Sequence, residues 1–383
     1  MRILHVSDCY LPRLGGIEVQ VADLIRMQRQ AGHQVEVATA TPGEPLAGVH
    51  RIVARLPFDL PVHPLGTGYL LRLMRVRRPD VVHVHAGAVS PFAWMGVRAA
   101  TRAGLPVVVT VHSMWDPVTR AMYRGLRLLS GWHRWGLVGT AVSEAAALPI
   151  RAVAGPGVPV HVVSNGLDVS GWRSAGPGSG GVPGREPSGP GVSGGEASGP
   201  VHVVAVGRLA PRKQPLRLLR LLKEARARVP AETPMRATVV GDGPARSRME
   251  RYLNANGMTG WVSLPGRYSR ERIRELLVSA DVFVAPAPRE SFGLAALEAR
   301  AAGVPVVARA QSGVADFVRP GKEGLLGRSF DELVTSVARL VRDRELRESI
   351  AAHNRETEPV RSSWPAVLEG FERCYDQARS RRD

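Results

Sequence analysis

Short apolar runs alternate with segments of helical periodicity along nearly the whole chain of 383 residues, and this alternation restricts the fold more than any other feature. The apolar runs predict strands near 3–7, 35–38, 81–85, 107–111, 138–142 and 160–163, and again near 202–206, 237–240, 261–264, 281–285, 304–307 and 324–326. Helices are expected between them. Repeated strand–helix alternation predicts parallel sheets with helices on both faces. The chain is therefore expected to be an α/β protein with two doubly wound sheets.

A stretch rich in Gly, Pro and Ser separates the two halves. Within residues 174–200, 20 of the 27 residues are of these three types, and no apolar periodicity is present. Such a composition cannot bury enough apolar surface to order itself, so we expect a flexible linker or surface insertion. The predicted division is an N-terminal domain over 1–170, this linker over 174–200, a C-terminal domain over 201–363, and a last helix with a tail over 364–383.

The overall charge is strongly positive, with a formal net charge of +17. Nearly all of the basic residues are Arg, which fits a compositional bias, and no zinc-finger spacing or aromatic RNP-like strand accompanies them. Nucleic acid is therefore not an expected partner. The chain shows no signal-peptide pattern and no apolar run of membrane-spanning length, and the two cysteines, Cys9 and Cys374, indicate a reducing cytoplasm.

The segment from Arg289 to Glu298 follows a predicted strand and opens a predicted helix. At such a turn the first helical N–H groups lack partners within the helix, and they bind anions, above all phosphate. Glu290 and Ser291 lie in this turn. Glu298 lies further along the helix, from where its carboxylate suits the hydroxyl groups of a sugar. The plain alternative is a turn with two solvated acidic side chains.

Two cations follow the first strand of the second half. Arg208 comes at the end of this strand and Lys213 near the next helix start, so both can flank one diphosphate, Arg as a bidentate fork and Lys as a point charge. The chain has no Asp-x-Asp motif, which enzymes that hold a sugar diphosphate through Mg²⁺ or Mn²⁺ generally need. Neutralisation by the two cations and a helix N-terminus predicts chemistry without a metal or an obligatory cofactor.

In the first half of the chain, the candidate binding residues also lie at strand ends or helix starts. Gly15 and Gly16 precede the first long helix, where small residues let the backbone approach a ligand closely. His112 follows the strand 107–111, at the edge where α/β sheets place ligands. His83 and His85 lie on one face of a strand, but no third metal ligand is evident, so no metal site is expected.

Taken together, the Gly pair, the strand-end His, the Arg–Lys pair and the two glutamates around Ser-Phe-Gly-Leu resemble the pattern of the family 4 retaining glycosyltransferases of the GT-B fold. The resemblance implies two Rossmann-like domains that face each other across a cleft, and a C-terminal helix that crosses back to the first domain. It also implies residue roles. Catalytic roles fall to His112, Arg208, Lys213 and Glu290, and acceptor binding falls to Gly15, Gly16 and His112. Donor binding falls to Gly16, Arg208, Lys213, Arg267, Tyr268, Glu290, Ser291, Phe292, Gly293, Leu294 and Glu298.

The activity implied is transfer of a hexosyl group from a UDP- or GDP-sugar to a glycan, lipid-linked or small-molecule acceptor, with retention at the anomeric carbon and without a metal. Two alternatives stay open: a nucleotide-sugar-binding protein without transferase activity, and a nucleotide-sugar epimerase of the same fold. For Arg267 and Tyr268, ordinary turn chemistry is the alternative.

A basic amphipathic segment adds a candidate partner. One predicted helix over 120–135 carries a stripe of Arg beside large apolar residues, which is the composition of an interfacial helix. The stripe is Arg120, Arg124, Arg127 and Arg134, and the apolar residues are Leu128, Leu129, Trp132 and Trp135. An anionic membrane surface, at the inner face of the cell membrane, is therefore a candidate partner. The alternative is an ordinary surface helix with its apolar face packed inward.

Overall fold

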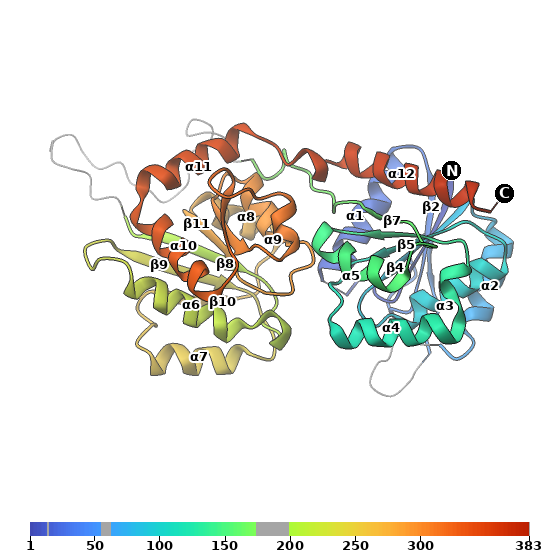
Figure 1. The fold of residues 1–383 in the computed structure, drawn as a ribbon, viewed down its shortest axis with the longest axis horizontal. Helices are drawn as coiled ribbons and strands as arrows, with labels where there is room; N and C mark the ends of the chain where they lie inside the picture. The colour runs from blue at the N-terminus through green and yellow to red at the C-terminus, as the bar shows by residue number, and fades with distance from the viewer. Residues whose placement is uncertain (14, 55–62, 174–198, 383) are drawn as a thin grey trace.

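The computed structural model describes residues 1–13, 15–54, 63–173 and 199–382. It contains two parallel sheets, each flanked by helices, which lie side by side along the long axis of the molecule (Figure 1). The predicted linker, except for its last two residues, lies outside the described residues. The limits predicted for the domains stay predictions.

The first sheet has seven strands in the order β3-β2-β1-β4-β5-β6-β7, and all of its pairings are parallel. The strands are β1 (Arg2–Ser7), β2 (Gln34–Thr39), β3 (Val49–Arg51), β4 (Val81–Ala86), β5 (Val107–Val111), β6 (Val138–Ala141) and β7 (Val160–Val162). The helices are α1 (Gly16–Gln30), α2 (Gly66–Arg77), α3 (Pro91–Arg102), α4 (Pro117–Ser130), the 3-10 helix η2 (Trp132–Arg134) and α5 (Glu144–Ala154). Central strands covered on both faces explain the Val-rich runs of the sequence.

The second sheet has six strands in the order β10-β9-β8-β11-β12-β13. The strands are β8 (Val201–Val206), β9 (Met235–Val240), β10 (Val262–Gly266), β11 (Val282–Ala285), β12 (Val306–Arg309) and β13 (Gly324–Gly327). The helical segments are η3 (Pro211–Lys213), α6 (Pro215–Ala227), α7 (Arg246–Ala255), α8 (Arg270–Val278), α9 (Leu294–Ala301), η4 (Gly313–Asp316), α10 (Phe330–Arg342), α11 (Arg344–Glu356) and η5 (Val360–Ser362). The strand order reverses beside β1 in the first sheet and beside β8 in the second, and α/β proteins bind ligands at such switch points.

The last helix, α12 (Trp364–Ser380), leaves the second domain and lies across the first (Figure 1). Its apolar face, with Trp364, Phe371 and Tyr375, joins a buried cluster that includes Ile3 of β1 and Val21 of α1. Burial of this face holds the two domains to one another through the chain itself. The predicted fold class, two Rossmann-like sheets with a returning C-terminal helix, is confirmed.

Three local expectations differ from the structure. Strand β3 and helix α11 were not expected from the sequence, because neither shows a clear apolar pattern. The expected helix over 120–135 ends at Ser130, where Gly131 adopts a left-handed conformation with φ of 63°, and Trp132 beyond it is buried. The prediction of one helix over 120–135 with a continuous Arg stripe is therefore wrong.

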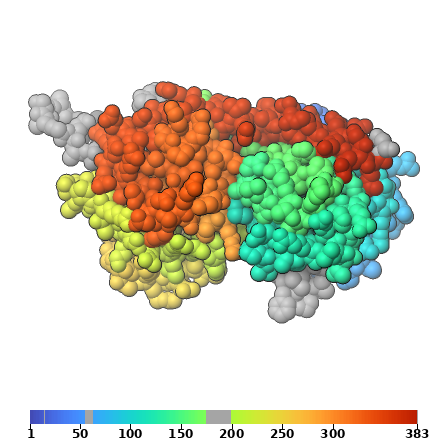
Figure 2. Space-filling view, in the orientation of Figure 1, coloured from blue at the N-terminus to red at the C-terminus, as the bar shows by residue number. Residues whose placement is uncertain are grey.

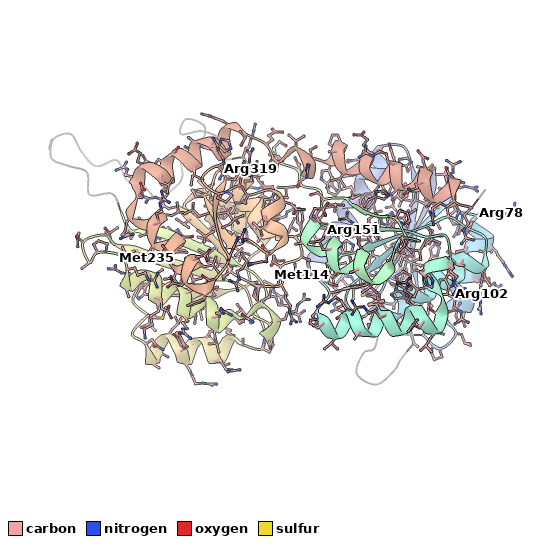
Figure 3. All side chains as sticks on the ribbon, in the orientation of Figure 1. Arg78, Arg102, Met114, Arg151, Met235 and Arg319 are labelled. Atoms are coloured by element: carbon pink, nitrogen blue, oxygen red, sulfur yellow. The ribbon has the colours of Figure 1, made fainter. Side chains whose placement is uncertain are left out.

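The two domains are in contact in the space-filling view, and the C-terminal segment runs along one side of both, with α11 on the second domain and α12 on the first (Figure 2). Met114, in the loop that follows β5, lies at the boundary between them (Figure 3). The carboxyl ends of the central strands carry the loops that meet at this boundary. The candidate site is built from these loops.

Candidate active site

Lys213 and Glu290 form the centre of the candidate site. Lys213 ends η3, which follows β8, and Glu290 lies in the loop after β11, the parallel neighbour of β8. Because neighbouring parallel strands end at the same edge of a sheet, the two side chains meet, and the Lys213 ammonium donates a hydrogen bond to Glu290 Oε2. Both side chains are partly exposed. Each can therefore exchange its partner for a ligand without leaving a fully buried charge behind.

Arg208 lies in the same strand-end loop as Lys213. Its side chain is exposed, and it makes no hydrogen bond or ion pair within the part of the chain that the structure describes. The turn at Gly241 supports this loop from below. Gly241 has a φ of 143°, and a Cβ there would lie 1.9 Å from the Gly207 carbonyl oxygen, so only glycine allows this approach. Leu209 N donates to the Asp242 carbonyl at 2.9 Å and fixes the loop beneath Arg208.

The loop that carries Glu290 turns directly into α9. Gly293 makes the turn with a φ of 91°, and a Cβ there would lie 2.5 Å from Val314. No side chain caps α9, and Ala296 N already donates to the Gly293 carbonyl at 2.9 Å, so among the described residues the N–H groups of Leu294 and Ala295 remain open to an anion. The Phe292 ring is buried against Phe317. Phe292 therefore shapes the loop from the core, and only its backbone can face a ligand.

Polar contacts tie this loop to the first domain. The Ser291 hydroxyl donates to the backbone carbonyl of His112 at 2.7 Å, and the Ser143 hydroxyl donates to the Ser291 carbonyl at 2.5 Å. Arg289 pairs with Asp116, with 2.9 Å between Nη1 and Oδ2. The Glu290 loop and the strand-end His, which lie far apart in the sequence, are thus brought into direct contact.

His112 is partly buried at the end of β5. Its Nε2 lies 3.0 Å from His85 Nδ1, and its ring lines a small pocket with Gln20 and Gly166. Burial lowers the pKa of His112 to about 4. The imidazole is therefore neutral near pH 7, and it can take part in a hydrogen bond with a sugar but cannot contribute a positive charge.

Glu298 is buried on α9. Its carboxylate lies 3.7 Å from Arg270 Nε, and Arg270 in turn pairs across the domain boundary with Asp23 of α1 at 3.3 Å. Burial raises the pKa of Glu298 to about 7; the nearby Arg270 lowers it and Asp23 raises it further. A carboxyl group that changes charge near neutral pH is typical of a functional site.

Gly15 and Gly16 begin α1 at the same boundary. No side chain caps this helix, and a Cβ at Gly16 would meet no atom within 4 Å. Gly15 is more restricted, because a Cβ there would lie 2.4 Å from Glu18 Oε2, and Glu18 is itself paired with Arg13 at 3.2 Å. Open space and free N–H groups at a helix start again suit an anionic ligand.

Arg267 and Tyr268 follow β10, which is separated from β8 by β9. Gly266 accepts a hydrogen bond from Gly241 N at 2.8 Å, so this turn joins the one that supports Arg208. The Arg272 guanidinium lies over the Tyr268 ring, with 4.2 Å between Arg272 Cζ and the ring centroid. Both residues thus lie further along the same sheet edge.

Two residues that the sequence analysis did not single out take part in closing the site. Asp116 and Ser143 are the N-cap residues of α4 and α5, where each accepts a hydrogen bond from the helix backbone. Each also contacts the Glu290 loop or its flank from the first domain. Their position between a predicted strand and the next predicted helix, as residue types that favour N-caps, was the available signal.

Two Rossmann-like domains with a cation–carboxylate pair at the strand ends between them define a glycosyltransferase of the GT-B fold. Residues 14–170 match the family described as Glycosyltransferase Family 4, and residues 193–357 match the one described as Glycosyl transferases group 1. The chain belongs to this family, the group 1 glycosyltransferases of family 4.

Full-length relatives agree with this assignment. A GDP-mannose-dependent alpha-mannosyltransferase from Mycobacterium tuberculosis (strain CDC 1551 / Oshkosh) is 31% identical over 100% of this chain and 98% of its own length. A GDP-mannose-dependent alpha-(1-6)-phosphatidylinositol monomannoside mannosyltransferase from the same strain is 27% identical over 99% and 100%. Among solved structures, Anabaena HepE in complex with UDP superposes with a TM-score of 0.74 at 18% identity, covering 97% of this chain and 99% of that one.

Within the described ranges, no helix combines the length and apolar character that crossing a membrane requires.

Proposed function

We propose that this glycosyltransferase moves a hexosyl group from a nucleotide-sugar, with GDP-mannose as the first candidate among UDP- and GDP-sugars, to an acceptor with retention at the anomeric carbon. The observation that carries the proposal is the Lys213–Glu290 pair at adjacent strand ends, in a loop whose next residue, Ser291, bonds to the His112 backbone of the other domain. The full-length similarity to a GDP-mannose-dependent mannosyltransferase supports the choice of donor.

In the proposed site, different residues bind the diphosphate, the transferred sugar and the nucleoside of the donor. Arg208 and Lys213 bind the diphosphate, and their positive charge stabilises the negative charge that grows on the leaving phosphate. Glu290 releases Lys213 and accepts hydrogen bonds from hydroxyl groups of the transferred sugar. Glu298 holds the ribose, and Arg267 with Tyr268 faces the base. Gly15 and Gly16 leave room for the acceptor and the diphosphate at the start of α1.

Incubation with donor alone and then with an acceptor set tests the proposal. The expected result is slow hydrolysis of one nucleotide-sugar, and faster release of nucleotide when a suitable acceptor is added. The anomeric coupling in the NMR spectrum of the product should show the same configuration as the donor. Binding without turnover with any acceptor of the set, or recovery of an epimerised nucleotide-sugar, would instead support one of the two alternatives.

Transfer is expected to survive chelation. In the proposed site Arg208, Lys213 and the α9 N-terminus neutralise the diphosphate, so a divalent metal would add little neutralisation there. Initial rates should therefore agree within about twofold in EDTA and in Mg²⁺, a difference of only ~0.4 kcal/mol in activation free energy. A complete loss in EDTA that Mn²⁺ or Mg²⁺ restores would contradict this expectation.

We also propose that α4 attaches the protein to an anionic membrane surface and so brings it to a lipid-linked acceptor. Val118, Met122, Leu126 and Leu129 recur at helical spacing on α4 and are all exposed, Val118 at 77% and Leu129 at 87%. Arg124 is exposed on the same helix. Arg124 lies beside Leu128, which is 86% exposed, and a helix that exposes both apolar residues and Arg has the composition of an interfacial helix at anionic lipid. The relative named as a phosphatidylinositol monomannoside mannosyltransferase supports this choice of surface.

Vesicle sedimentation at low salt tests the membrane proposal. The protein should sediment with phosphatidylglycerol vesicles and stay in the supernatant with neutral phosphatidylcholine vesicles, because each basic residue near an anionic surface adds about 1 kcal/mol. Arg124→Glu combined with Leu129→Gln should abolish sedimentation. Arg127 is left unchanged because its guanidinium donates to the Val153 carbonyl at 3.0 Å and supports the fold.

The matched control is Val360→Gln, which removes an exposed apolar side chain, 68% exposed, from the connection to α12. This variant should sediment like the wild type. Equal recovery of the wild type in the supernatant with both vesicle types would favour an acceptor in solution.

A further inference from the structure

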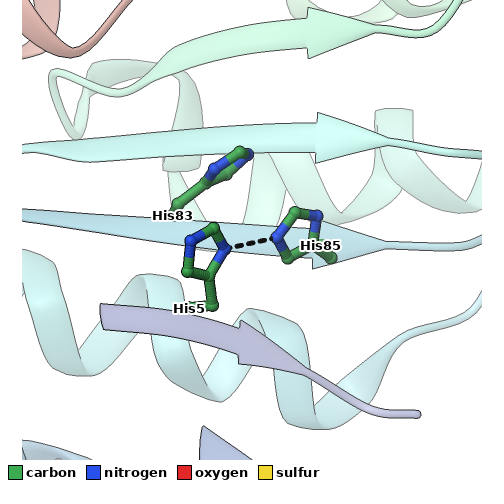
Figure 4. A group of neighbouring side chains, drawn as sticks. All are labelled: His5, His83 and His85. Atoms are coloured by element: carbon green, nitrogen blue, oxygen red, sulfur yellow. Dashed lines mark hydrogen bonds between the residues drawn. The ribbon is translucent and has the colours of Figure 1, made fainter. Parts of the chain in front are cut away.

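A buried group of histidines continues from His112 into the core of the first domain. His5 of β1 lies beside His83 and His85 of β4, since the parallel register pairs His5 with His83 (Figure 4). The sequence pattern indicated His83 and His85 as a pair, and His5 is a third histidine beside them that it did not indicate. All three are buried, and their nearest ring nitrogens lie within 4.8 Å of one another.

Every ring nitrogen of these three histidines already has a protein partner. His5 Nδ1 lies 2.8 Å from His85 Nε2, and His5 Nε2 lies 2.8 Å from Gln28 Oε1. His85 Nδ1 continues the chain to His112 Nε2 at 3.0 Å. His83 forms a separate branch, 2.8 Å from the Tyr375 hydroxyl and 2.7 Å from Thr110 Oγ1. Side-chain hydrogen bonds therefore satisfy the cluster, and a metal ion would have to displace them.

The rings are neutral, so each carries one N–H group. Burial lowers the pKa of His5 and of His112 to about 4, and it lowers the pKa of His83 and His85 as well. In a row of neutral rings, each nitrogen–nitrogen contact holds one proton, and a ring that donates on one side must accept on the other. The protons in the row from His5 to His112 therefore point either all one way or all the other.

Gln28 of α1 determines the direction. In this structure its amide NH₂ donates to the Tyr375 hydroxyl at 2.8 Å, so its carbonyl oxygen faces His5 and accepts. His5 then donates from Nε2 and accepts at Nδ1 from His85 Nε2–H. His85 in turn accepts at Nδ1 from His112 Nε2–H. The remaining nitrogen, His112 Nδ1, is left with a lone pair and makes no hydrogen bond within the described part of the chain.

We propose that Gln28, held by Tyr375 of the returning helix, is a positioning residue that fixes the tautomer of His112, so that His112 Nδ1 accepts a hydrogen bond from a hydroxyl group of the transferred sugar. The tautomer stands independently of the enzyme's activity, whereas its use on a sugar rests on the proposed function. The C-terminal helix thereby sets the hydrogen-bonding character of a residue at the cleft, through Gln28 and two buried imidazoles.

NMR of the ligand-free protein with ¹⁵N-labelled histidine tests the tautomer. In the wild type, His112 Nδ1 should resonate as an unprotonated nitrogen and Nε2 as a protonated one, with the assignment made from His112→Gln. Gln28→Glu replaces the amide with a side chain that still accepts from His5, so His112 should keep its tautomer. Gln28→Met has a similar shape but no acceptor, and it should give His112 a mixed or reversed tautomer.

Kinetics then separate positioning from general damage. Gln28→Met should lower kcat/KM by about five- to tenfold, the loss of one hydrogen bond, while Gln28→Glu stays within about twofold of the wild type. In a series of deoxy-sugar donors, one analogue should abolish the difference between Gln28→Met and the wild type. The matched control is Gln377→Met, which breaks the exposed hydrogen bond between Gln377 and His161 on the same returning helix and should change nothing.

A protonated His112 Nδ1 in the wild type, or the same tautomer in Gln28→Met, would overturn the proposal. So would stoichiometric zinc in the purified protein together with metal-shifted ring nitrogens. Melting temperatures of the variants show whether they fold. Because the spectra need no substrate, a protein that has the expected tautomer but no transferase activity refutes only the proposed function.

Discussion

The Lys213→Met variant is expected to turn over about 10²–10³-fold more slowly than the wild type at saturating donor, the effect of removing one preorganised group from the charge that develops on a leaving group. Met keeps the length and apolar stem of Lys but not its charge. The side chain is only partly buried, so the change should cost little stability. The measurements are steady-state kcat and KM for the donor and the melting temperature.

Glu290→Gln should give a loss of similar size, because Gln cannot accept charge-assisted hydrogen bonds from the sugar hydroxyls on both oxygens. Since Lys213 and Glu290 contact each other, the two losses in activation free energy should not add. The double variant should therefore turn over about as slowly as the less active of the two single variants. Lys322→Ala, which removes an exposed Lys from a turn, is the matched control and should keep full activity. Near-normal turnover of Lys213→Met would remove this pair from the catalytic site.

Glu298→Gln is expected to stabilise the protein at pH 8 while weakening donor binding. Burial raises the pKa of Glu298 from 4.5 to about 7, so between these values the folded protein binds a proton that the unfolded chain has released. The free energy of unfolding therefore falls as pH rises through this window. By pH 8 the cost is on the order of 3 kcal/mol, and the neutral Gln side chain does not incur it.

Urea unfolding at pH 5 and at pH 8 tests this. The difference in unfolding free energy between Glu298→Gln and the wild type should be larger at pH 8 than at pH 5 by most of this amount, because at pH 5 only a small part of the cost is present. In parallel, if Glu298 holds the ribose as proposed, the wild-type affinity for the donor should improve as pH rises through about 7, when its carboxyl group ionises, and the variant should lose this pH dependence. Glu345→Gln, on the exposed side of α11, serves as the control. Identical unfolding free energies of variant and wild type at both pH values would show that Glu298 ionises normally.

The prediction of the fold from the sequence failed where an element carries no apolar pattern. Strand β3 is a three-residue edge strand that is half-buried throughout, so it gives no apolar run. Helix α11 buries only Ile350 and Asn354, which is too little for a recognisable amphipathic stripe. In contrast, the interior strands were found to within two residues, because burial on both faces makes each of them a mostly apolar run rich in Val.

The prediction of the site had a similar limit. The residues at strand ends could be found, because a strand that turns into a helix exposes N–H groups and side chains at a known edge of the sheet. The buried partners could not. The sequence pattern around His5 does not distinguish this residue from other strand residues, and the pattern around Gln28 does not distinguish it from other helix residues. Tyr375 can be recognised only as part of an apolar helix face.

Two parallel α/β sheets, the family, and a set of residues at strand ends could be predicted from the sequence, because strand burial, helix periodicity and turn chemistry are properties of neighbouring residues. Which of those residues meet depends on the tertiary structure. Lys213 reaches Glu290 across 77 positions because β8 and β11 are neighbours, and His5 reaches His85 across 80 because β1 and β4 are. Strand order depends on the packing of the whole chain, so contacts of this kind cannot be obtained from local pattern.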